Sequence, residues 1–382
     1  MIFRRSCVIS FIACVCLAAL SCASTGKAQN VQQKDLQNST DQNDSKITLV
    51  FAGDIMAHKI NYTAGNFEEI WRDIKPIVKN SDLAFANLEA PVNDRMEWST
   101  YPQFNMHSAY VNAAIDAGFN VFSLANNHTN DWYLDGIKAT GHFFNSNKNV
   151  WACGIKEKSG APLTYRLIQK NDWKILFVAV TEILNRPDFA SYIDYYPAKK
   201  HGKLIEELKA LAQNTPHDLF VLSVHTDDEE YKTKVTESRK KFFKTLASEC
   251  GIDIIWANHP HVSMEFEKIE LEDGRQTFIM YANGNTISGQ RTNPSFYKKP
   301  NERDLTGDGL LFKIVCSKSR KFDSIDSYFI TTLIKSNGQF VIRLVDDDLI
   351  HSLDRSGVDH WKNYLVERRK IYDSLKEKSK WQ

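Results

Sequence analysis

Four apolar segments of this chain each end abruptly in carboxylate, amide or imidazole side chains, and this pattern constrains the fold more than any other feature. Residues 121–124 have the β-branched and aromatic character of a strand buried on both faces, and Asn127 and His128 follow where that strand would end. The other segments are residues 49–52 before Asp54, 220–224 before His225, and 252–257 before His259 and His261. The carboxyl ends of parallel strands meet at one edge of an open sheet, where ligands bind. We therefore expect the four ends to come together.

Each of these polar ends also has a plainer explanation when it is taken alone. Asn127 and His128 could belong to the cap of a following helix, and Asp54 could be a helix N-cap. Glu89 follows a further predicted strand at residues 83–86 and could be a surface glutamate. The functional interpretation therefore depends on several such ends occurring together.

The order of the predicted elements indicates an α/β fold that changes character half-way along the chain. In the first half, strands alternate with helices, in the order 47–52, 67–79, 83–86, 109–117, 121–124 and 134–145. Such alternation favours right-handed crossovers and a mainly parallel sheet. The second half continues with a hairpin around Asp273-Gly274 and then with predicted strands at 310–315, 326–334 and 340–344. Two sheets that face each other, with helices outside, fit this order.

The charge balance and the cysteines exclude some classes of function. Lys and Arg number 48 and Asp and Glu 47, for a net charge of +1, so no global field attracts nucleic acid. Four of the seven cysteines lie within the first 22 residues. Cys153, Cys250 and Cys316 are scattered without metal-like spacing, and we interpret them as small core residues.

The first 22 residues predict a lipoprotein signal peptide. Arg4 and Arg5 precede an apolar run at 7–20, which is too short for a comfortable membrane span. Residues 19–22 resemble a bacterial lipobox, which predicts a lipid anchor on Cys22 and a membrane-anchored protein of the cell envelope, facing the periplasm or the exterior. Plain cleavage and release is the alternative. Residues 23–46 are polar, and this composition predicts a disordered tether to a domain at 47–345.

The last segment, residues 346–382, is predicted to be a basic, amphipathic helical extension. Its apolar positions include Trp361, Leu365 and Leu375. Such a helix could lie on a membrane surface, but we expect it to pack on the domain.

The polar strand ends together predict a metal site. The candidate residues are Asp54, Glu89, Asn127, His128, His225, His259 and His261. Carboxylate, amide and imidazole ligands suit one or two divalent transition metal ions, Mn²⁺, Fe or Zn²⁺, and the absence of cysteine ligands argues against a structural zinc site. Two cations bridged by a carboxylate can activate a water and neutralise charge on a phosphoryl or carbonyl group. The predicted chemistry is therefore hydrolytic.

The order of these motifs resembles a known family. Gly53-Asp54, Asn87-Leu88-Glu89, Asn126-Asn127-His128 with Asp131, His225 and His259-Pro260-His261 are together similar to the bacterial capsule synthesis CapA-like family. That family is associated with poly-γ-glutamate and lies within the calcineurin-like metallophosphoesterase superfamily. The resemblance covers residues 47–287, and residues 281–285 are similar to a further element of the family.

The resemblance implies a four-layer α/β/β/α sandwich with metals at the rim of the two sheets. By position, Asp54 and His261 would hold one metal, and Asn127, His225 and His259 the other. The resemblance also implies that Glu89 bridges the two ions and that His128 is the general acid or transition-state donor.

The sequence departs from the family pattern in two places. Met56 stands where the superfamily has the histidine of Asp-x-His, and a thioether is a poor ligand for a hard cation; His58 is a candidate substitute. The segment after His225 is lengthened by one residue and lacks the family's glycine, and Asn258 replaces another glycine. The acidic residues at 227–230 would repel a polyanion unless they contact a cation.

These features support a first hypothesis and two alternatives. The first is a membrane-anchored CapA-like protein that acts in the synthesis, export or processing of an extracellular anionic polymer, with a membrane synthetase or export complex as a possible partner. One alternative is an active metal-dependent phosphoesterase of another surface substrate. The other is a lipoprotein that binds polymer without turnover because Met56 has weakened the metal site. Whether the protein is an enzyme stays open at this stage.

Overall fold

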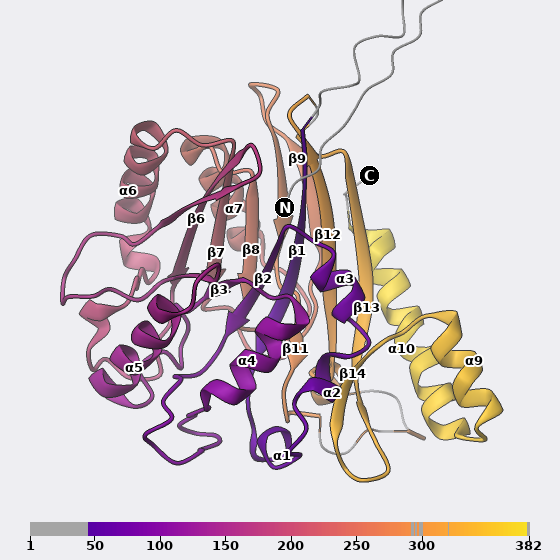
Figure 1. Ribbon diagram of the computed structural model, residues 1–382. Helices are drawn as coiled ribbons and strands as arrows, with labels where there is room; N and C mark the ends of the chain where they lie inside the picture. The colour runs from indigo at the N-terminus through magenta and orange to yellow at the C-terminus, as the bar shows by residue number, and fades with distance from the viewer. Residues whose placement is uncertain (1–44, 292–293, 295, 298–300, 320, 380–382) are drawn as a thin grey trace, which may run out of the picture. The chain divides into compact units, whose positions relative to one another are not determined.

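The computed structural model describes residues 45–291, 294, 296–297, 301–319 and 321–379 (Figure 1). The predicted signal peptide, the candidate lipid-anchor residue Cys22 and all but the end of the predicted tether lie outside the described residues. The first element of the described residues is a strand that begins at Lys46.

The first sheet has eight strands, and the second half of the chain completes it. Its order is β14-β13-β12-β1-β2-β3-β4, with β11 also paired to β1. Its parallel strands are β1 (Lys46–Ile55), β2 (Leu83–Leu88), β3 (Val121–Ser123), β4 (Trp151–Cys153) and β11 (Asn285–Ile287). The antiparallel strands are β12 (Asp308–Ser317), β13 (Ser324–Ile334) and β14 (Phe340–Leu344). The predicted late antiparallel strands therefore extend this sheet beyond β1.

The second sheet has six strands in the order β5-β6-β7-β8-β10-β9. They are β5 (Arg166–Lys170), β6 (Trp173–Thr181), β7 (Leu219–His225), β8 (Ile254–Asn258), β9 (Phe266–Glu270) and β10 (Gln276–Met280). The four central strands are parallel, and β5 and β9 pair antiparallel at the two edges. The predicted hairpin around Gly274 is β9–β10.

Helices cover the outer face of each sheet (Figure 1). On the first sheet these are α2 (Glu68–Trp71), α3 (Lys75–Lys79), α4 (Ser108–Ala117) and α5 (Tyr133–Ser146), whereas the single turn α1 (Lys59–Tyr62) lies at the end of the sheet. On the second sheet they are α6 (His201–Asn214) and α7 (Glu237–Cys250). Three more helices are α8 (Glu302–Leu305), α9 (Asp347–Arg355) and α10 (Asp359–Lys378), and two 3-10 turns are η1 (Ala190–Tyr192) and η2 (Ala198–Lys200). The predicted four-layer α/β/β/α sandwich is confirmed.

The middle of β1 is apolar at consecutive positions because both faces of the strand are buried. Leu49 and Phe51 belong to the core between the sheets, whereas Val50 and Ala52 belong to the core under the helices. Trp256 of β8 ties the sheets together, because its Nε1 donates a hydrogen bond to the Ala52 carbonyl at 2.8 Å. This contact fixes the ends of β1 and β8 relative to each other.

The structure corrects the prediction of a single helix at residues 67–79. The apolar spacing predicts one helix, but the structure has two short helices, α2 and α3, separated by a turn. Pro76 lies in the first turn of α3, where its missing N–H and fixed φ favour a helix start over the middle of a longer helix. The apolar face continues across the break, which is why the pattern alone does not reveal it.

The C-terminal helices pack on the domain, as predicted. Leu353 and Trp361 join the core between the sheets, and Arg368 is ion-paired with Asp308 of β12.

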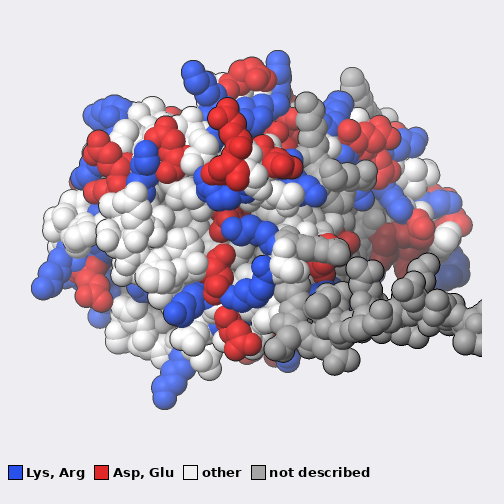
Figure 2. Space-filling view, turned by 90° about the horizontal axis from the view of Figure 1, so that it is seen from above, with Lys and Arg blue, Asp and Glu red and all other residues white. Residues whose placement is uncertain are grey.

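Within the described residues, no helix has the length and apolar character needed to cross a bilayer. On the face seen from above, where β1 begins, acidic and basic side chains are interspersed (Figure 2).

Candidate metal centre

The seven predicted site residues lie together at the carboxyl ends of five strands. Asp54 lies near the end of β1, Glu89 follows β2, Asn127 and His128 follow β3, His225 ends β7, and His259 and His261 follow β8. Each is at most 4% exposed. The geometry brings every predicted residue to one buried cluster, and their roles as ligands or acid stay predictions.

Glu89 occupies the centre of this cluster. Its side chain is fully buried, and Oε1 lies 3.8 Å from His225 Nε2 and 3.7 Å from His261 Nε2. Asn87 Nδ2 donates to Glu89 Oε2 at 3.2 Å, but Oε1 has no hydrogen-bond partner among the described residues. A buried, unpaired carboxylate oxygen between two imidazoles is the arrangement that a cation would complete.

Asp54 and His261 meet on one side of Glu89. His261 Nδ1 lies 3.1 Å from Asp54 Oδ2 and 3.1 Å from Asn285 Oδ1. Gly53 permits this approach, because a Cβ at that position would lie 1.8 Å from the Gly284 carbonyl oxygen. The chain therefore reaches the site through a position that only glycine can occupy.

His225, Asn127 and His259 form the other side. His225 Nε2 lies 2.9 Å from Asn127 Oδ1, and the His225 and His259 ring centroids are 4.9 Å apart. His259 Nδ1 is buried without a hydrogen-bond partner in the part of the chain that the structure describes. His259 and His261 both have positive φ, at 108° and 58°, which is uncommon for residues with a Cβ and typical of functional sites.

His128 is oriented by a carboxylate. Its Nδ1 lies 2.7 Å from Asp131 Oδ2, and that same oxygen accepts the Phe104 N–H at 2.7 Å. The Phe104 ring packs edge-on against the imidazole at a centroid distance of 4.8 Å. These contacts fix the ring plane and favour an Nδ1-protonated imidazole, which leaves Nε2 as the second ring nitrogen.

Burial controls the charge of the cluster. Desolvation, followed by the nearby charge of Asp54, raises the pKa of Glu89 well above its usual range. Desolvation and neighbouring imidazoles lower the pKa of His225 well below its usual value and that of His259 to about 3. Burial also opposes charge on His261, but hydrogen bonding to Asp54 outweighs it and raises the His261 pKa. Neutral imidazoles are the form that binds a metal ion.

Two groups of three side chains have ligand atoms that lie within 4.8 Å of one another: Glu89, His259 and His261, and Asp54, Glu89 and His225. Glu89 belongs to both groups. These groups place His259 with His261 and Asp54 with His225, whereas the resemblance pairs Asp54 with His261 and His225 with His259. Both divisions share Glu89, so this carboxylate is central to either one.

Neither Met56 nor His58 adds a ligand to these groups. Met56 is 1% exposed, and its backbone oxygen accepts a hydrogen bond from Tyr110. His58 Nδ1 accepts the Gly289 N–H at 3.0 Å, and His58 is absent from the ligand groups found among the described residues. The structure therefore gives no support to the predicted substitution by His58.

The acidic segment after His225 is paired in part with one buried arginine. Arg239 of α7 pairs with Asp227 at 2.7 Å, with Asp228 at 2.9 Å and with Glu182 at 2.6 Å. Although burial opposes its charge, hydrogen bonds from His201 and Arg239 lower the pKa of Glu182 to about 2. The expected repulsion of a polyanion by Asp227 and Asp228 is therefore reduced by a cation that the sequence does not place next to them.

Comparison with known proteins identifies the family. The model of the family described as "Bacterial capsule synthesis protein PGA_cap" matches residues 48–290, more than half of the chain. The chain belongs to this family.

Two relatives carry related descriptions. The chain is 26% identical over 303 residues to "Capsule biosynthesis protein CapA" of Bacillus anthracis, covering 74% of this chain and 68% of that protein. It is also 26% identical over 265 residues to "PGA biosynthesis protein CapA" of Bacillus subtilis (strain 168), covering 65% of this chain and 64% of that protein. The chain thus spans about two thirds of each relative.

Two solved structures are similar to this chain at lower sequence identity. A hypothetical protein from Thermus thermophilus has a TM-score of 0.44 at 16% identity, covering 74% of this chain and 98% of that one. A 5'-nucleotidase precursor from the same organism has a TM-score of 0.43 at 11% identity, covering 78% of this chain and 55% of that one.

Three asparagines support this family member's site without having been singled out from the sequence. Asn87 Nδ2 lies within 3.4 Å of Asp54, Glu89 and His225 atoms. Asn285 contacts His261, and Asn185 Nδ2 lies 3.2 Å from His128 Nδ1. Asn87 and Asn285 fall within the motifs that carry the resemblance, which is a signal that could have found them; Asn185 lies outside every motif.

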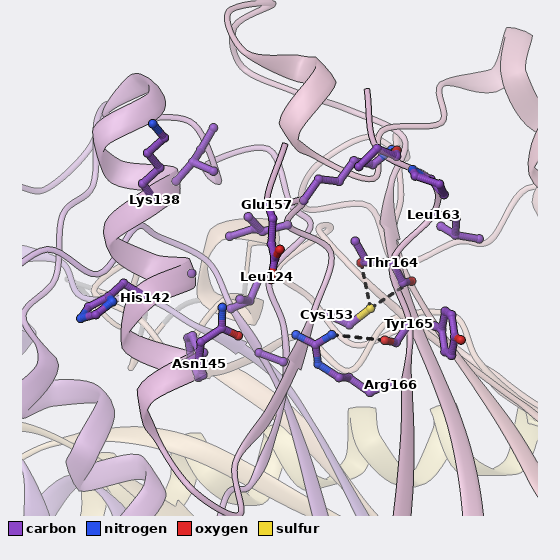
Figure 3. A pocket seen from close by; sticks show the side chains of 18 residues that line it. Leu124, Lys138, His142, Asn145, Cys153, Glu157, Leu163, Thr164, Tyr165 and Arg166 are labelled. Atoms are coloured by element: carbon purple, nitrogen blue, oxygen red, sulfur yellow. Dashed lines mark hydrogen bonds between the residues drawn. The ribbon is translucent and has the colours of Figure 1, made fainter. Parts of the chain in front are cut away.

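A cavity of about 640 Å³ lies between α5 and β5, apart from the metal cluster (Figure 3). Cys153 borders it, but its Sγ lies 3.2 Å from the Thr164 carbonyl oxygen and 3.1 Å from Thr164 Oγ1. Burial raises the pKa of this thiol to about 11. Cys153, Cys250 and Cys316 are buried and free, as predicted. Lys138, His142 and Arg166 also line this cavity.

Proposed function

We propose that this protein acts in the synthesis, export or processing of an extracellular anionic polymer of the capsule or poly-γ-glutamate type, using a metal-dependent hydrolytic site. The family and the two Bacillus relatives support the polymer class. The sequence around Cys22 supports a lipid-anchored location in the cell envelope, where a membrane synthetase or export complex is the natural partner.

The single observation that carries the hydrolytic proposal is the position of Glu89. Its unpaired Oε1 lies between His225 and His261, within 3.8 Å of an imidazole nitrogen of each. Leaving a carboxylate buried in this way is unfavourable, and one or two divalent cations would offset the penalty. The oxygen and nitrogen donors fit Mn²⁺, Fe or Zn²⁺.

A bound divalent cation would lower the pKa of a coordinated water and neutralise charge on a phosphoryl or carbonyl oxygen. The protein's own part is to position that chemistry. Asp54 and His261 would hold one ion, Asn127, His225 and His259 the other, and Glu89 would contact both. His128, held at Nδ1 by Asp131, would act as the acid only when both ring nitrogens carry a proton, and it would then donate the Nε2 proton to the leaving group.

Metal analysis and a hydrolysis assay test this function. Purified protein should contain one or two equivalents of transition metal and hydrolyse an aryl phosphodiester with added Mn²⁺. Glu89→Gln should lose both properties, whereas His128→Asn should lose only hydrolysis. His142→Asn is a matched control, because His142 lines the separate cavity. Unchanged hydrolysis in the His128 variant would exclude its assigned role.

Met56 favours a second candidate, which is polymer binding without turnover. The buried thioether replaces the histidine of the superfamily motif, which leaves Asp54, Glu89 and His261 as the protein ligands for the first ion. Losing the fourth ligand would weaken the binding of this ion, and with it the activation of water on which hydrolysis depends. A metal content of zero would favour this candidate, and two equivalents would favour the enzyme.

A further inference from the structure

Arg186 is next in sequence to a residue that contacts the candidate acid, and it has no anionic partner among the described residues. It follows Asn185, whose side-chain amide contacts both Asn127 and His128. The Arg186 guanidinium stacks 4.5 Å above the Tyr133 ring, which restricts its orientation. Its Nη1 atom is buried without a hydrogen-bond partner in the same set of residues. The residue as a whole is only partly buried, and its stacked guanidinium carries the positive charge that an anion would meet.

Arg303 is placed in a similar way on the His261 side. Its guanidinium lies 5.1 Å from the Tyr231 ring centroid, and Nη1 donates to the Tyr231 hydroxyl at 3.2 Å. The Tyr231 ring lies 6.4 Å from the His261 ring. In the described segments, no carboxylate forms an ion pair with Arg303 or with Arg186. Arg303 is therefore separated from His261 by the Tyr231 side chain, and Arg186 adjoins in sequence the asparagine that contacts Asn127 and His128.

The other charged residues near the metal cluster are mixed in sign. Glu230 adds negative charge, which contributes to the raised pKa of Glu89 after desolvation and Asp54. Asp227 and Asp228 are paired with Arg239. The two stacked arginines thus offset Glu230 and provide the positive groups that an anionic substrate would meet.

We propose that Arg186 and Arg303 each bind a carboxylate of a linear polyanion, one on each half of the metal cluster. An arginine fork binds a carboxylate through two parallel hydrogen bonds, and a tyrosine beneath it reduces the entropy lost on binding. A substrate with a single charged group can engage one arginine, whereas a γ-linked glutamate chain carries a carboxylate on every residue and can engage both. This inference rests on the proposed function, since it concerns the substrate of the same site.

The test measures binding of a fluorescein-labelled γ-glutamyl oligomer to the full-length protein by fluorescence anisotropy, in EDTA and again with Mn²⁺. Arg186→Gln and Arg303→Gln should each weaken binding about tenfold, and the double variant about a hundredfold. The corresponding lysine variants keep the charge but lose the fork, so they should fall between wild type and glutamine. Arg166→Gln is the matched control, because it removes one positive charge in the separate cavity and should leave affinity unchanged.

Two results would overturn the inference. One is an affinity in both glutamine variants equal to that of the Arg166 control. The other is that the glutamine variants lose as much affinity for the neutral methyl ester of the oligomer as for the charged oligomer. That result would show that the two arginines do not recognise the charge. Failure of the proposed function gives a different result. In that case the wild-type protein would contain no metal and show no hydrolysis, yet the arginine variants could still bind the oligomer more weakly. Conversely, metal-dependent hydrolysis with unaltered oligomer affinity contradicts only the arginine inference.

Discussion

Replacing Glu89 by glutamine should stabilise the metal-free protein while removing its response to metal. The carboxylate is fully buried, and its Oε1 has no hydrogen-bond partner in the described structure. Glutamine has nearly the same shape, and its carbonyl can still accept the hydrogen bond from Asn87. Its amide would then face His225 and His261, whose Nε2 atoms lie 3.8 and 3.7 Å from Oε1, so the unfavourable charge is lost without a cavity.

The expected magnitude follows from the burial of this group. A buried group left unpaired costs about 1–3 kcal/mol and more when it is charged, so replacing the carboxylate by a neutral amide should raise the free energy of unfolding of the metal-free protein by about 1–3 kcal/mol. A ligand present at about 100 times its dissociation constant stabilises the native state by about 2.7 kcal/mol. Wild type should gain this from Mn²⁺, and the variant should gain little. The order of the two stabilities should therefore reverse when metal is added.

Urea unfolding followed by tryptophan fluorescence, in EDTA and in saturating Mn²⁺, measures both effects. Glu157→Gln is a suitable control, because Glu157 is exposed and lines the separate cavity. Its unfolding free energy should match wild type in both conditions. If Glu89→Gln destabilised the metal-free protein and still responded fully to Mn²⁺, the carboxylate would not be the centre of a metal site.

Other positions give further expected outcomes. His128→Asn should lower aryl phosphodiester hydrolysis by about 10²–10⁴-fold without changing metal content, measured by steady-state kinetics and elemental analysis. Asp308→Asn should lower the free energy of unfolding by about 3–5 kcal/mol in urea titrations, because Asp308 pairs with two buried arginines, Arg291 and Arg368. Gly53→Ala should reduce both thermal stability and metal content, since its Cβ would overlap the backbone oxygen of Gly284. A melting temperature and metal content equal to wild type would contradict this last expectation.

Much of the fold could be predicted because strand character and turn residues are local signals. Strand β14 has the predicted bounds, and the apolar runs before Asp54, His225 and His259 are strands that end where expected. Convergence within each sheet was predictable because parallel strands share one carboxyl edge. The meeting of the β1 end with those of β7 and β8 was not, because it depends on how the two sheets face each other. The break between α2 and α3 was not, because the apolar face continues on both sides of Pro76.

The contacts that support the site could not be predicted from the sequence. Arg239 and Glu182 are 57 residues apart, and nothing in either segment indicates that they pair. The approach of Asn185 to His128 depends likewise on how the β6–α6 connection crosses to the first sheet. Such contacts depend on the three-dimensional packing of distant segments, whereas sequence patterns report only the candidate ligands themselves.

A crystal soaked in Mn²⁺ and measured for anomalous scattering tests the central claim most directly. The account predicts one or two anomalous peaks within the cluster, at coordination distance, about 2.0–2.2 Å, from a Glu89 oxygen and from nitrogens of His225, His259 or His261. Peaks confined to surface carboxylates, with Glu89 unliganded at saturating metal, would contradict it.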